Sequence, residues 1–209
     1  CDPKRIIIVG CIRMDNFIKK AKEYKFDKRN NAITLFSFRH SFGGMRFFHD
    51  GEGGFSISRK NGCVNYFDNV HGNLAKYAIE NPEVPVYIKL KWENAGWFEN
   101  VANAVNKKTG KFINEIPNLY VSSHFNPQEL IDKSRVIIGI NSTALIESRI
   151  LGKEVLIPLF DEPLEKYYEK HVYFKKYFKR EFNLIKDEDH FLKELDYLYK
   201  NTGSLRKVG

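Results

Sequence analysis

The stretch VIIGINSTALIESRILGKEVLIPLF, residues 136–160, decides the fold class of this chain. It begins with an apolar run that stops at three small polar residues, Asn141, Ser142 and Thr143. Helix-like apolar spacing follows as far as Gly152, and a second apolar run comes after it. Strand, polar turn, helix, glycine and strand in this order are typical of a βαβ unit.

The same alternation runs through the rest of the chain. Apolar runs bounded by turn residues predict strands, and apolar spacing of three and four predicts helices between them. This pattern favours an α/β fold, a Rossmann-like and mostly parallel sheet of about six strands with helices on both faces. We expect one such domain over 1–209. The predicted strands are 5–10, 32–38, 84–90, 118–123, 135–140 and 154–160, and the predicted helices are 15–24, 70–80, 94–108, 127–134, 143–151, 162–179 and 188–200.

Residues 41–69 interrupt the alternation. They are rich in Gly, Asn and aromatic residues, and the stretch is too long for an ordinary connection. We expect a functional loop, a small hairpin insertion or a locally mobile segment.

Composition limits the class of protein. Hydrophobic residues make up 43% of the 209 and charged residues 29%, which is typical of a globular chain. No apolar run approaches the roughly 20 residues of a membrane-spanning helix. Three cysteines without metal-ligand spacing argue against a disulfide framework or a zinc site and favour a cytoplasmic location. The start, CDPKR, has neither an initiator Met nor a signal peptide, so we expect a fragment of a longer protein.

The net charge of +8 indicates a partner that bears phosphate, whether nucleic acid, anionic membrane or nucleotide. Much of the excess lies in KYYEKHVYFKKYFKR, residues 166–180. One interpretation is a solvated helix face. The other is a contact with an acidic partner or an anionic membrane surface, which would place the protein peripherally at the inner face of the membrane.

Strand-to-helix turns are the candidate binding sites, because ligands of open α/β sheets lie at the carboxyl ends of the strands. At the first turn, Asn141 or Ser142 suits the N-cap of a helix whose N–H groups, with the hydroxyls of Ser142 and Thr143, suit a phosphate. Glu147, one turn further on, suits hydrogen bonds from ribose hydroxyls. The alternative is a simple helix cap with Glu147 exposed to solvent.

A second turn, FSFRHSFGG, follows the predicted strand 32–38. Arg39 and His40 bring charge and Ser41 a hydroxyl, and the two glycines that follow let the backbone approach a ligand closely. Such a turn suits a diphosphate or the charge that develops on a leaving group. The alternative is a basic surface loop without a ligand.

Two further turns bear polar groups. Lys89 and Lys91 end an apolar strand, where they either meet a phosphate or extend to solvent. Ser123 and His124 follow the next strand, where a flat nucleobase could lie, and Pro127 suits the first turn of the helix after them.

RVIIGINSTALIESRILGKEVLIP resembles the donor-nucleotide half of GT-B glycosyltransferases. Among these, it is similar to bacterial surface-carbohydrate enzymes, including capsule and Kdo transferases and the glycerophosphotransferases of teichoic acid synthesis. In that group a strand leads into a Ser-Ser/Thr pair, a helix with a Glu, and then GKPV. Here the pair is Ser142 and Thr143 and the acid is Glu147, while Glu154 stands in place of the Pro.

Two other segments bear on the resemblance. IIIVGCIRMD is similar to the family's strand followed by Gly-x-x-Arg-x-Asp, with Gly10, Arg13 and Asp15 in those places. Relatives often have a His-Pro pair after the lysine of the third turn. This chain has KLKWEN, so Lys89 matches and the histidine is absent.

The resemblance implies roles for several residues. Ser142 and Thr143, with the helix N-terminus, would bind the nucleotide phosphate. Glu147 would contact the ribose, Lys89 would neutralise the phosphates, and the turn at 122–125 would face the base. The donor would be a CMP-, CDP- or UDP-linked sugar, with no metal and no cofactor. The acceptor would be a saccharide or lipid-linked saccharide, held by an N-terminal acceptor domain outside this chain.

The general base is not fixed by the sequence, and Asp15 and His40 are its candidates. Two other functions stay open. One is a sugar-nucleotide epimerase of GT-B type, although such enzymes have more acids and histidines at the domain cleft. The other is a basic nucleic-acid-binding module, but no motif of the usual modules is present, so no nucleic acid is expected as a partner.

Overall fold

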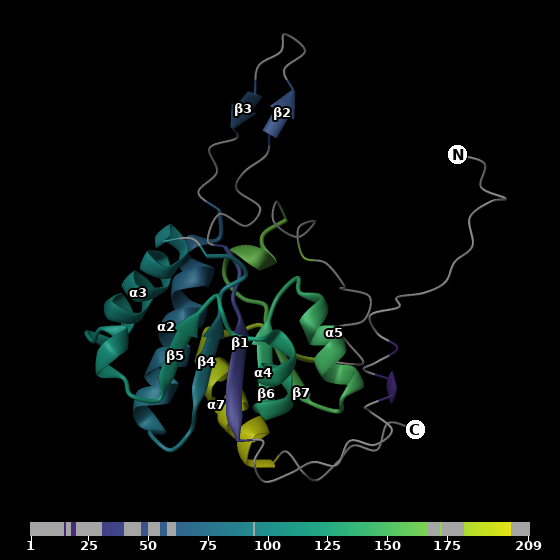
Figure 1. The fold of residues 1–209 in the computed structure, drawn as a ribbon. Coiled ribbons are helices and arrows are strands. Elements are labelled where there is room, and N and C mark those ends of the chain that lie inside the picture. The colour runs from purple at the N-terminus through teal and green to yellow at the C-terminus, as the bar shows by residue number, and fades with distance from the viewer. Residues whose placement is uncertain are drawn as a thin grey trace, which may run out of the picture.

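A computed structural model of the chain describes residues 15, 18, 19, 31–39, 47–49, 55–57, 62–93, 95–166, 172 and 182–201 (Figure 1). Several predicted features lie outside the described residues. They are the strand 5–10, most of the helix 15–24, the residues His40 and Ser41, and most of the basic segment 166–180.

The described residues contain one six-stranded sheet in the order β5-β4-β1-β6-β7-β8. Every neighbouring pair in it is parallel. Numbered along the chain, these strands lie in the order 3-2-1-4-5-6, which is the order of a Rossmann-type sheet. The predicted fold class is therefore confirmed. The strands are β1 (Ala32–Phe36), β4 (Val86–Lys89), β5 (Leu119–Ser122), β6 (Ser134–Gly139), β7 (Glu154–Pro158) and β8 (Asn183–Ile185).

Helices cover both faces of the sheet. The helices α2, α3 and α7 lie on one face, and α4 and α5 lie on the other (Figure 1). Two short 3₁₀ helices, η2 and η3, lie in the connections. The bounds are α2 (Val64–Glu80), α3 (Ala95–Thr109), η2 (Ile113–Glu115), α4 (Pro127–Lys133), α5 (Thr143–Ile150), η3 (Glu162–Leu164) and α7 (Glu188–Asn201).

Three elements differ clearly from the prediction. The helix α2 begins at Val64, six residues before the predicted 70–80, and Tyr66 and Phe67, which the prediction treated as part of the insertion 41–69, are buried at helical spacing with Val70. The predicted helix 162–179 starts as a 3₁₀ turn, in which Pro163 occupies an early position. The strand β8 was not predicted, since three residues are too few to show a strand pattern.

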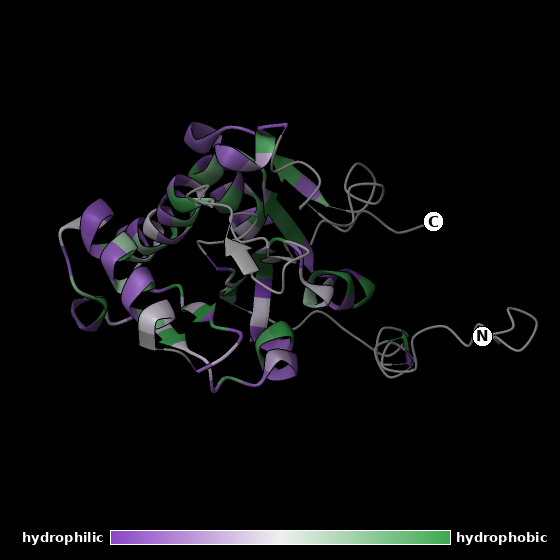
Figure 2. Cartoon of the chain, turned by 90° about the horizontal axis from the view of Figure 1, so that it is seen from above, coloured by the Kyte–Doolittle hydropathy of each residue, from purple (hydrophilic) through white to green (hydrophobic). Residues whose placement is uncertain are grey.

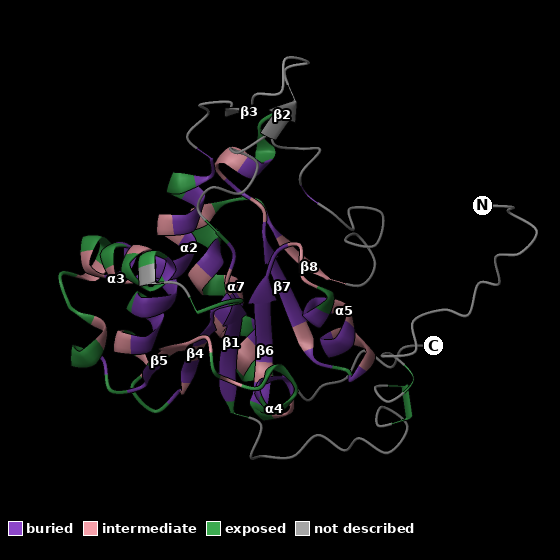
Figure 3. Ribbon diagram, turned by 45° about the horizontal axis from the view of Figure 1, so that its top comes forward, coloured by how far each residue is buried: buried purple, intermediate pink, exposed green. Residues whose placement is uncertain are grey.

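Burial explains why the apolar runs became strands. All five residues of β1 are buried, as are four of the five in β7. A parallel sheet with helices on both faces needs apolar residues at successive positions, not at alternate ones. Figure 3 shows the buried strands, and Figure 2 shows hydrophilic residues on the outer sides of the helices. Inside the sheet the Thr34 and Ser134 hydroxyls satisfy each other at 2.7 Å.

A separate antiparallel hairpin lies within residues 41–69. Its strands are β2 (Phe47–His49) and β3 (Phe55–Ile57), and it stands outside the six-stranded sheet (Figure 1).

Candidate functional site

The strand order reverses between β1 and β6. The chain leaves β1 toward β4 on one side of the sheet, and it later returns to place β6 on the other side. Loops that leave the two strands therefore diverge to opposite faces, and ligands of such sheets bind in the crevice between them.

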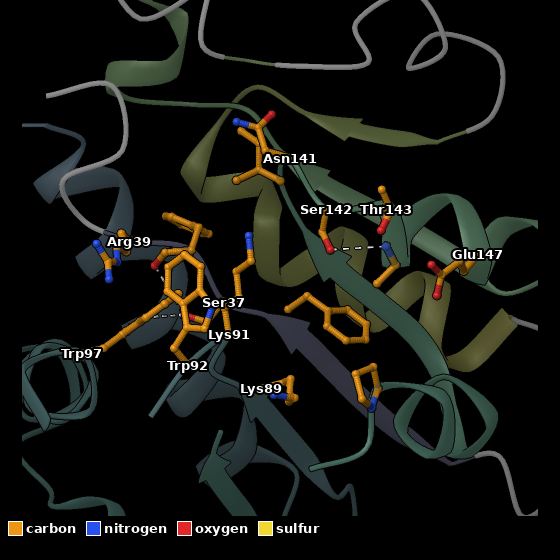
Figure 4. A pocket seen from close by; sticks show the side chains of 15 residues that line it. Ser37, Arg39, Lys89, Lys91, Trp92, Trp97, Asn141, Ser142, Thr143 and Glu147 are labelled. Carbon is orange, nitrogen blue, oxygen red and sulfur yellow. Dashed lines mark hydrogen bonds between the residues drawn. The ribbon is translucent and has the colours of Figure 1, made fainter. Parts of the chain in front are cut away.

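A cavity of about 510 Å³ lies at this point (Figure 4). Its volume is within the roughly 300–1,000 Å³ that is usual for small-molecule sites. The ends of β1, β4 and β6 and the beginnings of α4 and α5 form its wall. The lining residues are Phe36, Ser37, Phe38, Arg39, Lys89, Lys91, Trp92, Trp97, Pro127, Ile140, Asn141, Ser142, Thr143, Ala144 and Glu147.

The turn between β6 and α5 has the geometry of a helix cap. Asn141 adopts a φ of 57°, in the left-handed region that asparagine tolerates better than most residues. Ser142, not Asn141, is the N-cap, and its Oγ accepts a hydrogen bond from the Ala144 amide at 3.3 Å. A hydroxyl that accepts from its own helix keeps its hydrogen for another acceptor. Ser142 therefore caps the helix and also lines the cavity.

Gly139 sets the position of this turn. A Cβ on it would lie 3.1 Å from the Phe36 carbonyl oxygen and 3.2 Å from Leu145 Cδ2. The glycine thus lets β6 lie close to both β1 and α5. This close packing brings the first turn of α5 to the end of β1.

Glu147 lies in the cavity wall with only 2% of its surface exposed. The alternative in which this carboxylate extends to solvent is therefore wrong. A buried carboxylate requires hydrogen-bond donors around it. Glu147 lies four residues after Thr143, so the two side chains are on the same face of α5.

Lys89 is buried, so the alternative in which its side chain extends to solvent is also wrong. Its Nζ donates to the carbonyl oxygens of Leu90 and Ser123, both at 2.6 Å. Burial lowers the pKa of this ammonium. Since an ammonium has three donors, the two carbonyls leave one for a ligand.

Four side chains form an indole–cation cluster at one side of the cavity. The Arg39 guanidinium carbon lies 4.8 Å from the ring centroid of Trp92 and 5.7 Å from that of Trp97. Lys91 Nζ lies 4.6 Å from the Trp92 centroid. The two indoles meet edge to face at 5.8 Å. Cation–π attraction holds the two cations near the cavity.

Sequence reasoning missed both indoles. The signal was present, because Trp92 follows Lys91 directly and Trp97, the other tryptophan of the chain, lies five residues further on.

A series of hydrogen bonds links this cluster to the helix α2. His71 is fully buried, and its Nδ1 donates to the Phe67 carbonyl at 2.7 Å. Burial lowers the pKa of His71 to about 4, so the imidazole is neutral and its Nε2 is an acceptor. The Ser37 hydroxyl therefore donates to Nε2 at 2.8 Å, and Trp97 Nε1 donates to Ser37 Oγ at 3.0 Å. No local sequence motif marks these hydrogen bonds, because they join the end of β1 to α2 and α3.

Some predicted residues are not part of the cavity wall. Ser123 contributes only the carbonyl that accepts from Lys89. His124 is exposed, with Nε2 3.8 Å from Glu93 Oε1. Asp15 is exposed and does not line the cavity. In the part of the chain that the structure describes, no three His, Cys, Asp or Glu side chains are grouped as metal ligands, and no helix is long and apolar enough to cross a bilayer.

No protein family model matches the sequence, and no curated protein is a detectable relative. Solved structures similar to the chain include two variants of the wall teichoic acid polymerase TagF. Both are 13% identical, with TM-scores of 0.47 and 0.48, over 91% and 97% of this chain and 41% and 46% of theirs. A KpsC beta Kdo 2,7 transferase from Thermosulfurimonas dismutans is 14% identical over 69% of this chain and 39% of that one, with a TM-score of 0.32.

The chain spans less than half the length of each of these structures. The fold assignment itself rests on the strand order.

Proposed function

We propose that this chain is the donor-nucleotide-binding domain of a glycosyltransferase, which uses a nucleotide-activated sugar in the synthesis of a bacterial surface polysaccharide. The observation that supports it best is the composition of the cavity between β1 and β6. A helix N-terminus with two hydroxyls, three cationic side chains and one buried carboxylate line a single crevice at the switch point of the sheet.

The phosphates of the donor bind at the N-terminus of α5. This end of a helix bears roughly half a positive charge and presents N–H groups to an anion. The Ser142 and Thr143 hydroxyls add donors at the same place. Arg39 and Lys91, both exposed, supply the positive charge that neutralises the phosphates from the opposite wall.

The ribose binds beside Glu147. A carboxylate repels phosphate but accepts hydrogen bonds from two adjacent hydroxyls. Glu147 is one turn into α5, and one turn of helix rises about 5.4 Å. That separation matches a ligand with its phosphates at the helix end and its ribose one step deeper.

The same groups assist departure of the nucleotide. Negative charge develops on the phosphate as the glycosidic bond breaks, and fixed donors aimed at that charge lower the barrier. The helix end, Arg39 and Lys91 are such donors. The acceptor would be held by an N-terminal domain outside this chain. The base that deprotonates the acceptor would come from that domain or from one of the candidates Asp15 and His40.

The test is titration calorimetry with CMP, CDP, UDP, GDP and the corresponding nucleosides. Ser142→Ala and Thr143→Ala should each weaken the nucleotides about ten- to hundredfold, because a hydrogen bond to a charged group contributes roughly 1.5–3 kcal/mol. The bare nucleosides should be affected much less. Glu147→Gln should weaken nucleosides and nucleotides alike.

Loss of the helix cap needs its own control. Ser142→Ala removes a capping bond, which costs about 1 kcal/mol of stability. Asn126 caps α4 through the same kind of bond, to the Gln128 amide at 2.9 Å, and does not line the cavity. Asn126→Ala should lower stability without changing nucleotide affinity. Unchanged affinity in all three well-folded cavity variants would refute the site, and binding of a short oligonucleotide alone would favour the nucleic-acid module.

A further inference from the structure

The two ends of the cavity differ in chemistry. Figure 4 shows Glu147 and Thr143 on one side, the cluster of Arg39, Trp92 and Trp97 on the other, and Ser142 between them. A nucleotide sugar is a linear molecule of base, ribose, phosphates and sugar. If the proposed function is right, the ribose lies at Glu147 and the phosphates lie between Ser142 and the two cations of the cluster. The indoles of the cluster are then left for the group that follows the phosphates.

We propose that Trp92 and Ser37 form the subsite for the transferred sugar, which is a hydroxyl-bearing ring. The inference rests on the proposed function and adds to it the residues that hold the group being transferred. Neither residue belongs to the motif at 136–160.

Trp92 supplies the platform. Its indole is 49% exposed although it borders a cavity. Trp97 meets it edge to face, and the cations Arg39 and Lys91 lie over its ring. The part of the indole that these contacts leave exposed is flat and held in place, so it offers contact area at little cost in side-chain freedom. The C–H face of a sugar ring is a suitable surface to pack against it.

Ser37 selects the polar group. Its single hydroxyl hydrogen goes to His71 Nε2 at 2.8 Å, since the neutral imidazole already uses its own N–H for the Phe67 carbonyl, and the Phe38 carbonyl is a more distant acceptor at 3.4 Å. Trp97 donates to Ser37 Oγ. Any further bond that Ser37 makes toward the cavity must therefore be one that its oxygen accepts. A sugar hydroxyl can donate such a bond, whereas a phosphate oxygen cannot.

The experiment compares nucleotides with and without a sugar. Trp92→Leu is titrated with UDP and UDP-glucose, CDP and CDP-glucose, and GDP and GDP-mannose. The expected result is that the sugar-bearing member of the pair that binds loses roughly tenfold more affinity than the nucleoside diphosphate, whose own smaller loss reports the displacement of Arg39 and Lys91. Ser37→Ala should reduce the same difference in affinity. Phe98→Leu is the matched control, because Phe98 is an exposed aromatic of α3 that does not line the cavity.

Intrinsic fluorescence gives a second readout. The chain has two tryptophans, both in the cluster, so the difference between wild type and Trp92→Leu reports on Trp92. The sugar nucleotide should change this signal more than the nucleoside diphosphate does.

The outcomes separate the two proposals. If no nucleotide binds the wild-type protein, the proposed function fails and the sugar subsite fails with it. If Trp92→Leu weakens a nucleoside diphosphate and its sugar conjugate equally, Trp92 acts on the nucleotide, either directly or through Arg39 and Lys91. The sugar subsite is then overturned while the proposed function stands. If Trp92→Leu changes neither affinity, the subsite is likewise overturned.

Discussion

The buried His71 should make the protein sensitive to mild acid. Burial lowers the pKa of His71 from 6.5 to about 4. Between these two pH values the unfolded chain binds a proton that the folded chain does not bind. The free energy of unfolding therefore falls as the pH falls through this window. The full difference corresponds to roughly 3 kcal/mol, of which about 1.4 kcal/mol is lost between pH 7.5 and 5.5.

The measurement is urea unfolding at pH 7.5, 6.5 and 5.5 for wild type and His71→Gln. Glutamine keeps an acceptor for Ser37 but does not titrate, so the variant should lose about 1.4 kcal/mol less than wild type over this range. Carboxylates contribute little above pH 5.5, since their pKa values lie near 4. His124→Gln changes an exposed histidine and should keep the wild-type slope. Equal slopes in wild type and His71→Gln would refute a neutral, buried imidazole, and with it the assigned direction of the Ser37 hydrogen bond.

Two further predictions concern stability away from the cavity. Glu162 accepts from the amides of Asn65 and Tyr66 at 2.9 and 2.8 Å, so Glu162→Ala should cost about 1–2 kcal/mol in urea unfolding, with Glu162→Gln less damaging. No loss in Glu162→Ala would show that the carboxylate does not cap α2. Burial lowers the pKa of Lys153 from 10.5 to about 8, so the contribution of this residue to stability should rise with pH between these values. Burial raises the pKa of Cys63, Tyr66 and Tyr77, which act in the opposite direction, so the quantity to compare is the difference in unfolding free energy between wild type and Lys153→Met. That difference should grow in favour of wild type as pH rises through this window, and a constant difference would refute the lowered pKa.

The fold could be predicted because its strands are buried on both faces. Runs such as AITLF and EVLIP are continuous apolar segments between polar turns, and only a covered parallel sheet uses them at every position. The short strand β8 has no such run. The strand β8 forms by pairing with β7, in which Leu156 lies opposite Asn183. Residues so far apart in the sequence leave no local pattern that predicts their pairing.

Half of the cavity could be predicted for a similar reason. Ser142, Thr143 and Glu147 lie within six residues, and the strand–helix pattern alone brings them to one end of the sheet. Lys89 shows where local reasoning fails. Its position at a strand end was correct, but the carbonyls of Leu90 and Ser123 that take its hydrogen bonds lie on two different strand ends.

The other half of the cavity depends on contacts between distant elements. Ser37 follows β1, His71 lies in α2 and Trp97 in α3, yet one chain of hydrogen bonds joins them. The βαβ pattern therefore accounts for the groups that suit phosphate and ribose, which every nucleotide donor has in common. The side chains proposed for the sugar depend instead on hydrogen bonds that join the end of β1 to α2 and α3. A substitution in any of these three elements changes the arrangement of these side chains. Such a substitution can therefore change the preferred sugar while the phosphate-binding turn stays the same. The identity of the donor sugar should accordingly follow Ser37, Trp92 and Trp97 more closely than the motif at 136–160.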